Sequence, residues 1–171
     1  NQFTGLALFM DGDMVVNGDI AELFRVDRYG KAVHVVKHDY TPRDSKKYLG
    51  AVQQGYPRKN WSSVVLWDCS HYKTKKLTPE YVSNASGAEL HRFAWLDDDE
   101  IGELPKGWNY LCGEDNQEPD VEKRKLLHWT RGTPCFSEYE SSENAEVWWK
   151  EYNKTIHANN ASERIQKVKI V

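Results

Sequence analysis

Apolar and polar positions alternate along the chain in two recognisable ways, and the first is a set of short apolar runs. Runs of this length that are bounded by polar residues are typical of β-strands. They cover residues 5–10, 32–36, 62–67 and 125–130. The first run is continuous and ends abruptly at two acids, Asp11 and Asp13. A continuous apolar run predicts a strand buried on both faces, as in a parallel sheet.

Helix signals lie between these runs. Asp19 is followed three residues later by Glu22, which is the spacing of a capping box and predicts a short helix there. Thr78 and Pro79 are typical of an N-cap and a first helical residue, and Gly87 predicts the end of that helix. Because strands and helices interleave, the sequence predicts an α/β sandwich.

The C-terminal part contains one further helical pattern. Residues 142–156 place apolar side chains at helical spacing, which predicts a helix with one apolar face. The pattern weakens after about residue 159. We therefore expect one domain over residues 1–158 and a flexible C-terminal tail over residues 159–171.

Composition excludes some functions. The 171 residues contain 23 Lys and Arg against 26 Asp and Glu, a net charge of −3, which argues against a nucleic-acid binder. No run approaches the ~20 apolar residues needed to span a bilayer. Three cysteines lie far apart at Cys69, Cys112 and Cys135. An odd number without framework spacing fits reduced thiols, so we expect a cytoplasmic protein.

The most informative chemical element is the segment from Asp11 through Gly12 to Asp13. Carboxylates two residues apart in an extended chain project to the same side, here at the end of an apolar strand, where open α/β sheets bind ligands. Paired oxygen donors suit Mg²⁺ or Mn²⁺; the alternative is an acidic turn. His128 ends a later strand, either as a nitrogen ligand that favours Mn²⁺ or as a hydrogen-bonded structural residue. Gly132 follows it, and its amide can approach a phosphate.

Two further groups are candidates for binding a sugar. Asn60, Ser62 and Ser63 precede an apolar strand, where an amide and two hydroxyls can hydrogen-bond a sugar; an ordinary turn is the alternative. Asp97 and Asp98 belong to an acidic run, which is either a solvated face or a functional one.

Six motifs, taken in order, resemble a known family. They lie at residues 9–15, 19–24, 58–66, 95–98, 104–109 and 128–134, and the likeness extends from about residue 5 to about residue 150. The chain resembles the glycogenin-like, retaining branch of the GT-A-fold glycosyltransferases and its bacterial and phage relatives. The resemblance implies a mixed, mostly parallel sheet flanked by helices.

The resemblance also assigns a metal site. In that family the carboxylates of the D-x-D motif and a late histidine bind Mn²⁺, which bridges the diphosphate of a nucleotide-sugar. It therefore implies that Asp11, Asp13 and His128 hold Mn²⁺ or Mg²⁺, and that the donor is a nucleotide-sugar such as UDP-hexose.

The resemblance also implies phosphate contacts, and at one of them this sequence differs from the family. Gly132 corresponds to a residue near the phosphates. Where the family has Lys-Pro-Trp, residues 133–135 are Thr, Pro and Cys. The phosphate-stabilising lysine is thus missing, and we expect Arg131 to substitute for it.

The resemblance places the sugar-side residues as well. Asn60 and Ser62 match the strand entry that contacts the donor sugar or the acceptor, and Ser63 next to Ser62 is a further candidate for binding the donor. Either Asp97 or Asp98 matches an acid that hydrogen-bonds the transferred sugar. The resemblance leaves both open, because the family's Asp-Gln is Asp-Asp in this sequence.

The implied reaction is metal-dependent, retaining transfer of a hexose to the hydroxyl of a glycan or another acceptor. Family members carry an N-terminal nucleotide-binding half before the D-x-D motif, whereas here Asp11 comes almost at once. The chain therefore resembles the C-terminal two-thirds of such an enzyme, and the base-binding half was either removed or lies in another polypeptide. The alternative is a non-catalytic nucleotide- or sugar-binding module derived from such an enzyme.

Overall fold

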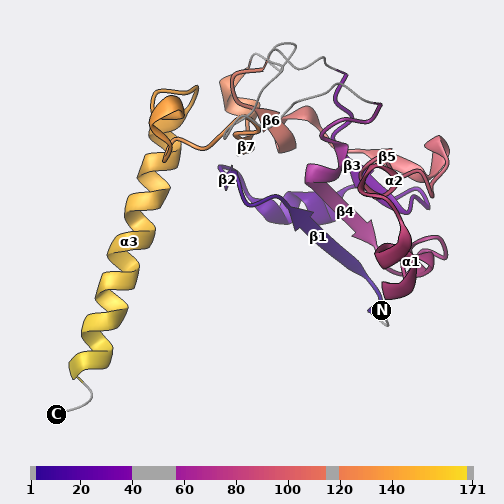
Figure 1. Ribbon diagram of the computed structural model, residues 1–171, viewed down its shortest axis with the longest axis horizontal. Coiled ribbons are helices and arrows are strands. Elements are labelled where there is room, and N and C mark those ends of the chain that lie inside the picture. Colours follow the sequence, from indigo (N-terminus) through magenta and orange to yellow (C-terminus); the bar gives the residue numbers. More distant parts are fainter. Residues whose placement is uncertain (1–2, 40–56, 115–119, 169–171) are drawn as a thin grey trace.

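The computed structural model describes residues 3–39, 57–114 and 120–168, and in this part of the chain the strands form two sheets (Figure 1). The four-stranded sheet has the order β1-β4-β3-β5 and the three-stranded sheet the order β2-β7-β6. The strands are β1 (Leu6–Met10), β2 (Met14–Val16), β3 (Val33–Val35), β4 (Val64–Asp68), β5 (Ile101–Glu103), β6 (Tyr110–Leu111) and β7 (Leu126–His128). The predicted α/β class is confirmed.

Both sheets are mixed. β4 pairs antiparallel with β1 and β3, and β2 pairs antiparallel with β7, whereas the β3–β5 and β6–β7 pairs are parallel. The parallel share is thus smaller than predicted, because an apolar run reports burial and carries no information on strand direction. β1 is an edge strand among the described residues, and Phe9 is 49% exposed, so the prediction of burial on both faces is wrong for this strand.

Two short helices cover part of the four-stranded sheet region. They are α1 (Pro79–Asn84) and α2 (Gly87–His91). The Thr78 side chain accepts from the Tyr81 N–H, which confirms the predicted N-cap. Gly87 was expected to end this helix but is the first residue of α2, because the Ser86 side chain starts a new helix by accepting from the Glu89 N–H. An N-cap can restart a helix where a glycine alone predicts a stop.

The helix predicted after Asp19 is present as a 3-10 helix, η1 (Ile20–Arg25). The Asp19 side chain accepts from the Ala21 N–H, two residues ahead. Glu22 is directed elsewhere, because its carboxylate pairs with Lys125 near the start of β7. The expected reciprocal bond of a capping box is therefore replaced by a contact that is distant in sequence.

The last helix, α3 (Ala145–Val168), is longer than the pattern predicts and continues past residues 156 and 158. Figure 1 shows α3 projecting away from the two sheets. Its base is held by Glu143, whose carboxylate accepts from the Tyr110 hydroxyl at 2.7 Å and from Arg124 at 2.9 Å. None of the helices in the described part of the chain is long and apolar enough to cross a membrane.

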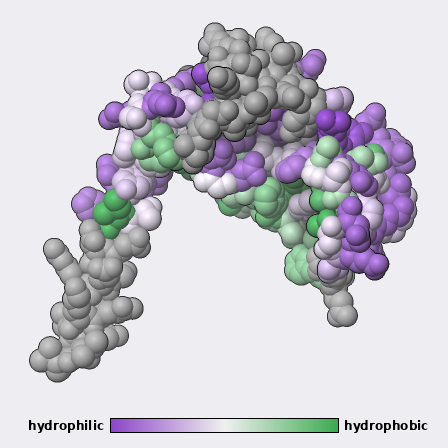
Figure 2. Space-filling view, in the orientation of Figure 1, coloured by the Kyte–Doolittle hydropathy of each residue, from purple (hydrophilic) through white to green (hydrophobic). Residues whose placement is uncertain are grey.

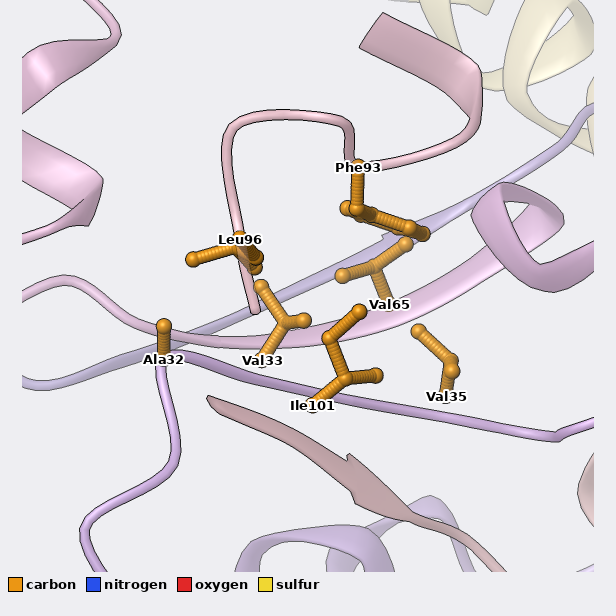
Figure 3. Packing of buried hydrophobic residues seen from close by; sticks show 7 residues of the cluster. All are labelled: Ala32, Val33, Val35, Val65, Phe93, Leu96 and Ile101. Atoms are coloured by element: carbon orange, nitrogen blue, oxygen red, sulfur yellow. The ribbon is translucent and has the colours of Figure 1, made fainter. Parts of the chain in front are cut away.

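The core consists of neighbouring clusters that fix the sheets. Figure 3 shows one of them, in which side chains of β3, β4 and β5 pack with Phe93 and Leu96. A second cluster includes Val64 from β4 and Leu126 from β7 and therefore joins the two sheets. Figure 2 shows that hydrophobic residues also gather on the lower side of the body in this view.

Candidate metal and donor site

Asp11, Gly12 and Asp13 form the short link between β1 of one sheet and β2 of the other. Its backbone is held at both ends. The Asp11 N–H donates to the Ser63 carbonyl at 2.9 Å, and the Trp129 N–H donates to the Asp13 carbonyl at 3.1 Å. The two acidic side chains therefore extend from a segment whose position is set by both sheets.

His128 lies beside these acids because of the β2–β7 register. Met14, which follows Asp13, is directly opposite His128 in this antiparallel pair. One ligand atom from each of Asp11, Asp13 and His128 lies within 4.8 Å of the others, and His128 Nε2 is 3.3 Å from Asp13 Oδ1. The predicted juxtaposition of these three side chains is confirmed.

The donor set fits a divalent cation. Two carboxylates and one imidazole suit Mn²⁺ better than Ca²⁺ and are also compatible with Mg²⁺. Asp11 is exposed and Asp13 half-buried, whereas His128 is buried, so the cluster is open on the carboxylate side. A cation held here would be accessible to further oxygen ligands such as phosphate.

A second histidine and a lysine lie near this cluster. Burial, together with the neighbouring His128 and Lys106, lowers the pKa of His38 to about 3. His38 is thus a neutral neighbour of the cluster at physiological pH.

The turn before β4 carries the predicted sugar-side residues. Asn60 has a left-handed backbone, with φ 61°, and precedes the 3-10 helix η3 (Trp61–Ser63). The Ser63 hydroxyl is buried and donates to the Asn60 carbonyl at 2.6 Å. Ser62 Oγ lies 2.9 Å from His91 Nδ1. The Ser63 hydroxyl therefore stabilises the turn itself.

Asp97 and Asp98 are exposed and paired with basic residues. Asp97 lies 3.3 Å from Lys73 Nζ, and Asp98 pairs with Arg58. Arg58 belongs to the turn that carries Asn60, so this ion pair places Asp98 beside the predicted sugar-side turn.

Gly132 and Arg131 follow β7. A Cβ at Gly132 would stand 2.3 Å from the Tyr139 ring, so packing requires glycine there independently of any phosphate. The Arg131 guanidinium lies near Gly113, 3.8 Å from where a Cβ of that glycine would stand. These positions give the phosphate roles of both residues no further geometric support.

Sequence reasoning assigned no role to Asn109, which is fully buried and contacts His128. It lies in the 104–109 motif, which contributed only to the family resemblance. The one signal available was a polar amide directly after Trp108, in a segment that leads into a strand. Arg58 was missed for a similar reason, because its partner Asp98 is 40 residues away.

Two apolar cavities lie on one face of the β1–β4 pair. They have volumes of about 350 and 300 Å³ and share the residues Phe9, Trp67 and Leu77. The smaller one is also lined by Ser62 and His91. Neither is lined by the Asp11, Asp13 and His128 cluster, so they are separate from the candidate metal centre.

Comparison with known proteins identifies the family of this chain. The family model of glycosyl transferase family 8 matches residues 6–133. The chain belongs to this family. Asp11, Asp13 and His128 all lie within the matched residues.

The chain is also similar to individual proteins. The chain is 45% identical over 161 residues to Protein CDI of Arabidopsis thaliana, covering 90% of the chain and 61% of that protein. Its fold is similar to that of the glycosyltransferase GlyE of Streptococcus pneumoniae TIGR4, with a TM-score of 0.54 at 20% identity. The apo form of GlyE gives a TM-score of 0.58 at 17% identity.

The chain spans only part of each relative. The two GlyE matches each include 87% of this chain, but they include only 40% and 39% of the GlyE chains. At these identities the likeness to GlyE shows the fold alone.

Proposed function

We propose that this chain carries the metal and donor site of a glycosyltransferase that moves a hexose from a nucleotide-diphosphate sugar to an acceptor hydroxyl. The observation that carries the proposal is the cluster of Asp11, Asp13 and His128 at the junction of the two sheets. Membership of glycosyl transferase family 8 supports the reaction class.

Asp11, Asp13 and His128 would hold Mn²⁺ or Mg²⁺. When bound, the cation would supply Lewis-acid stabilisation of the diphosphate leaving group, an effect worth several kcal/mol. The chain itself contributes a rigid placement of the three ligands, because the Asp11 N–H and the Asp13 carbonyl are both hydrogen-bonded to neighbouring strands or turns. A preorganised site stabilises developing charge without reorganising during the reaction.

The sugar-side roles are part of the same proposal. Asn60 and Ser62 would contact the transferred sugar or the acceptor, and Asp98, with Asp97 next to it, would accept a hydrogen bond from a sugar hydroxyl. The pairing of Asp98 with Arg58 in the Asn60 turn supports this grouping. Retention of anomeric configuration is the stereochemistry that the glycogenin-like resemblance favours.

The remaining assignments concern the phosphates. Gly132 would approach the phosphates through its amide. Arg131 would provide the positive charge that a lysine supplies in other family members and that this chain lacks. Ser63 would act indirectly, since its hydroxyl already donates to the Asn60 carbonyl.

A second function is favoured by one observation. Residues 133–135 are Thr, Pro and Cys in place of the family's Lys-Pro-Trp. A chain without the phosphate-binding lysine could serve as a non-catalytic nucleotide- or sugar-binding module. Such a module would retain binding and lack transfer.

We also propose a reducing compartment for this chain. Cys69, Cys112 and Cys135 are all free, and Cys135 is exposed. Free thiols, one of them exposed, suit a reducing compartment such as the cytoplasm.

Calorimetry with UDP in the presence and absence of Mn²⁺ tests the proposal. Binding of UDP that requires Mn²⁺ is the expected result, since the protein would recognise the diphosphate through the cation. The matched control is Asp13→Asn, which retains size and removes the charge of one ligand. UDP binding of equal strength without Mn²⁺ contradicts the metal site. Metal-independent binding of a free glycan, with no Mn²⁺-dependent binding of UDP, favours the binding module.

A further inference from the structure

The metal ligand His128 has a buried partner on its far side. His128 Nδ1 lies 2.9 Å from Asn109 Oδ1, and both residues are buried. Asn109 belongs to the 3-10 helix η6 (Lys106–Asn109), which immediately precedes β6. The other imidazole nitrogen, Nε2, faces Asp13.

The orientation of the Asn109 amide follows from its remaining contacts. Asn109 Nδ2 lies 3.3 Å from the Asn60 carbonyl oxygen, which can only accept, so the amide nitrogen must be the atom on that side. Nδ2 also lies 2.8 Å from Ser63 Oγ. The single hydroxyl hydrogen of Ser63 is directed to the Asn60 carbonyl, so Ser63 Oγ accepts from Asn109.

The atom that faces the imidazole is therefore the Asn109 oxygen, an acceptor. His128 Nδ1 must then carry its hydrogen and donate. In the neutral imidazole this leaves the Nε2 lone pair directed to the Asp13 side, where a cation would accept it. A histidine that ligates through one nitrogen commonly donates from the other to a fixed acceptor, which sets its tautomer and ring orientation.

We propose that Asn109 is the positioning residue of the metal centre, which holds His128 in the Nδ1-protonated tautomer so that Nε2 is available to the cation. This inference rests on the proposed metal site. Asn109 does not touch the cation or the donor; it acts through His128.

The same amide connects the metal ligand to the sugar-side turn. Asn109 binds the Asn60 carbonyl and Ser63 Oγ, and the Ser63 carbonyl accepts from the Asp11 N–H. Asn109 thus joins His128 to the turn that also fixes the backbone of Asp11. One buried amide sets the relative position of ligands from two sheets.

The tautomer is measured first, in the metal-free 171-residue chain. The ¹⁵N chemical shifts of the His128 ring are recorded in protein labelled at histidine and assigned with His128→Gln. In the neutral ring of the wild-type chain we expect Nδ1 to carry the hydrogen and Nε2 to be unprotonated. A protonated Nε2 with an unprotonated Nδ1 overturns the inference, whatever the metal affinity.

Metal affinity is measured next, by electron paramagnetic resonance titration of Mn²⁺ in the presence of UDP. Asn109→Leu has no acceptor and is expected to weaken Mn²⁺ binding by about 10- to 100-fold. Asn109→Asp retains an acceptor for Nδ1–H but has no donor for the Asn60 carbonyl, so it is expected to bind Mn²⁺ more tightly than Asn109→Leu and more weakly than the wild type. Equal affinity of the Leu variant and the wild type overturns the positioning role.

Thr130→Val is the matched control. Thr130 is also buried, lies two residues from His128, and its hydroxyl has no hydrogen-bond partner among the described residues. The Mn²⁺ affinity of Thr130→Val should equal that of the wild type. A loss as large as that of Asn109→Leu would indicate general loosening of the buried region and overturn the inference.

If the wild-type chain binds no Mn²⁺, the proposed function fails, while the tautomer measurement still decides the role of Asn109. Should Asn109→Leu fail to fold, Asn109→Asp and the wild-type tautomer carry the test.

Discussion

The backbone N–H of Asp11 donates to the carbonyl oxygen of Ser63 at 2.9 Å. This bond joins the residue directly after β1 to the last residue of the turn before β4, its antiparallel neighbour. The first acidic ligand is therefore placed by strand pairing, as Asp13 is by the bond from Trp129. A site built on paired strands is more precise than one carried by a long loop.

Removing a metal ligand should abolish catalysis while preserving the fold. In the full-length protein, Asp13→Ala and His128→Ala are each expected to lower hexose transfer by at least about 10²-fold, because charge stabilisation at the leaving group is lost. Transfer is measured with a radiolabelled nucleotide-sugar, and circular dichroism checks the fold. Asp99→Asn changes an exposed carboxylate outside the cluster and should leave transfer unchanged. Near-normal transfer by either ligand variant would remove the metal-site assignment.

Arg58 should contribute to stability through its fork of donors. Nη1 donates to the Arg92 carbonyl at 2.7 Å and to the Phe93 carbonyl at 2.9 Å, while Nη2 pairs with Asp98. Lysine cannot bridge three acceptors in this geometry, so Arg58→Lys is expected to lower the free energy of unfolding by about 1–3 kcal/mol.

Urea denaturation measures this difference, and Arg28→Lys is its control. The Arg28 side chain is about half exposed and lies 3.9 Å from Asp68, so its replacement should change stability by less than about 0.5 kcal/mol. Equal effects of the two substitutions would show that the carbonyl contacts of Arg58 do not matter.

Gly102 should not tolerate a side chain. It lies opposite His34 in the parallel β3–β5 pair, and a Cβ there would stand 2.2 Å from His34 Cδ2. Gly102→Ala is expected to cost about 1–3 kcal/mol through overpacking. At Gly87 the nearest contact of a new Cβ is 4.0 Å away, so Gly87→Ala should be within about 0.5 kcal/mol of wild type.

A double-mutant cycle isolates the cause of the Gly102 effect. His34→Ala removes the ring that a Cβ at Gly102 would meet, so the double variant should lose less stability than the sum of the single variants. Strict additivity would mean that the cost at Gly102 arises from somewhere other than His34.

The three thiols should react at different rates. Burial raises the pKa of Cys112 to about 12, so at pH 8 only about one molecule in 10⁴ carries its thiolate. Burial also raises the pKa of Cys69, which is half-buried, whereas Cys135 is exposed. Alkylation with iodoacetamide followed by peptide mass spectrometry should modify Cys135 first and Cys112 last. Rapid native-state modification of Cys112 would contradict its burial.

The sequence was sufficient for local features whose cause is local. Apolar runs located strands, and Thr78 followed by Pro79 located the start of α1, because hydrophobic burial and N-capping act over a few residues. Strand direction was less well predicted, since a run such as residues 5–10 is equally apolar in either direction. The prediction that Gly87 ends the helix is wrong because the adjacent Ser86 caps a second helix.

Contacts between distant residues explain what the sequence missed at the site. Asp11, Asp13 and His128 were grouped through motif order, and strand pairing brings them together. Asn109 was not found because its role depends on His128 and on Ser63, which is 46 residues away. Periodicity and spacing do not contain that information, whereas hydrogen-bond satisfaction in the folded chain does.

Anomalous diffraction from crystals grown with Mn²⁺ and UDP measures the central claim most directly. We expect one manganese peak within about 2.0–2.3 Å of an oxygen of Asp11, an oxygen of Asp13 and Nε2 of His128, as is usual for oxygen and nitrogen ligands of such cations. A manganese peak that contacts none of these three side chains, or no peak beside the UDP diphosphate, would contradict it.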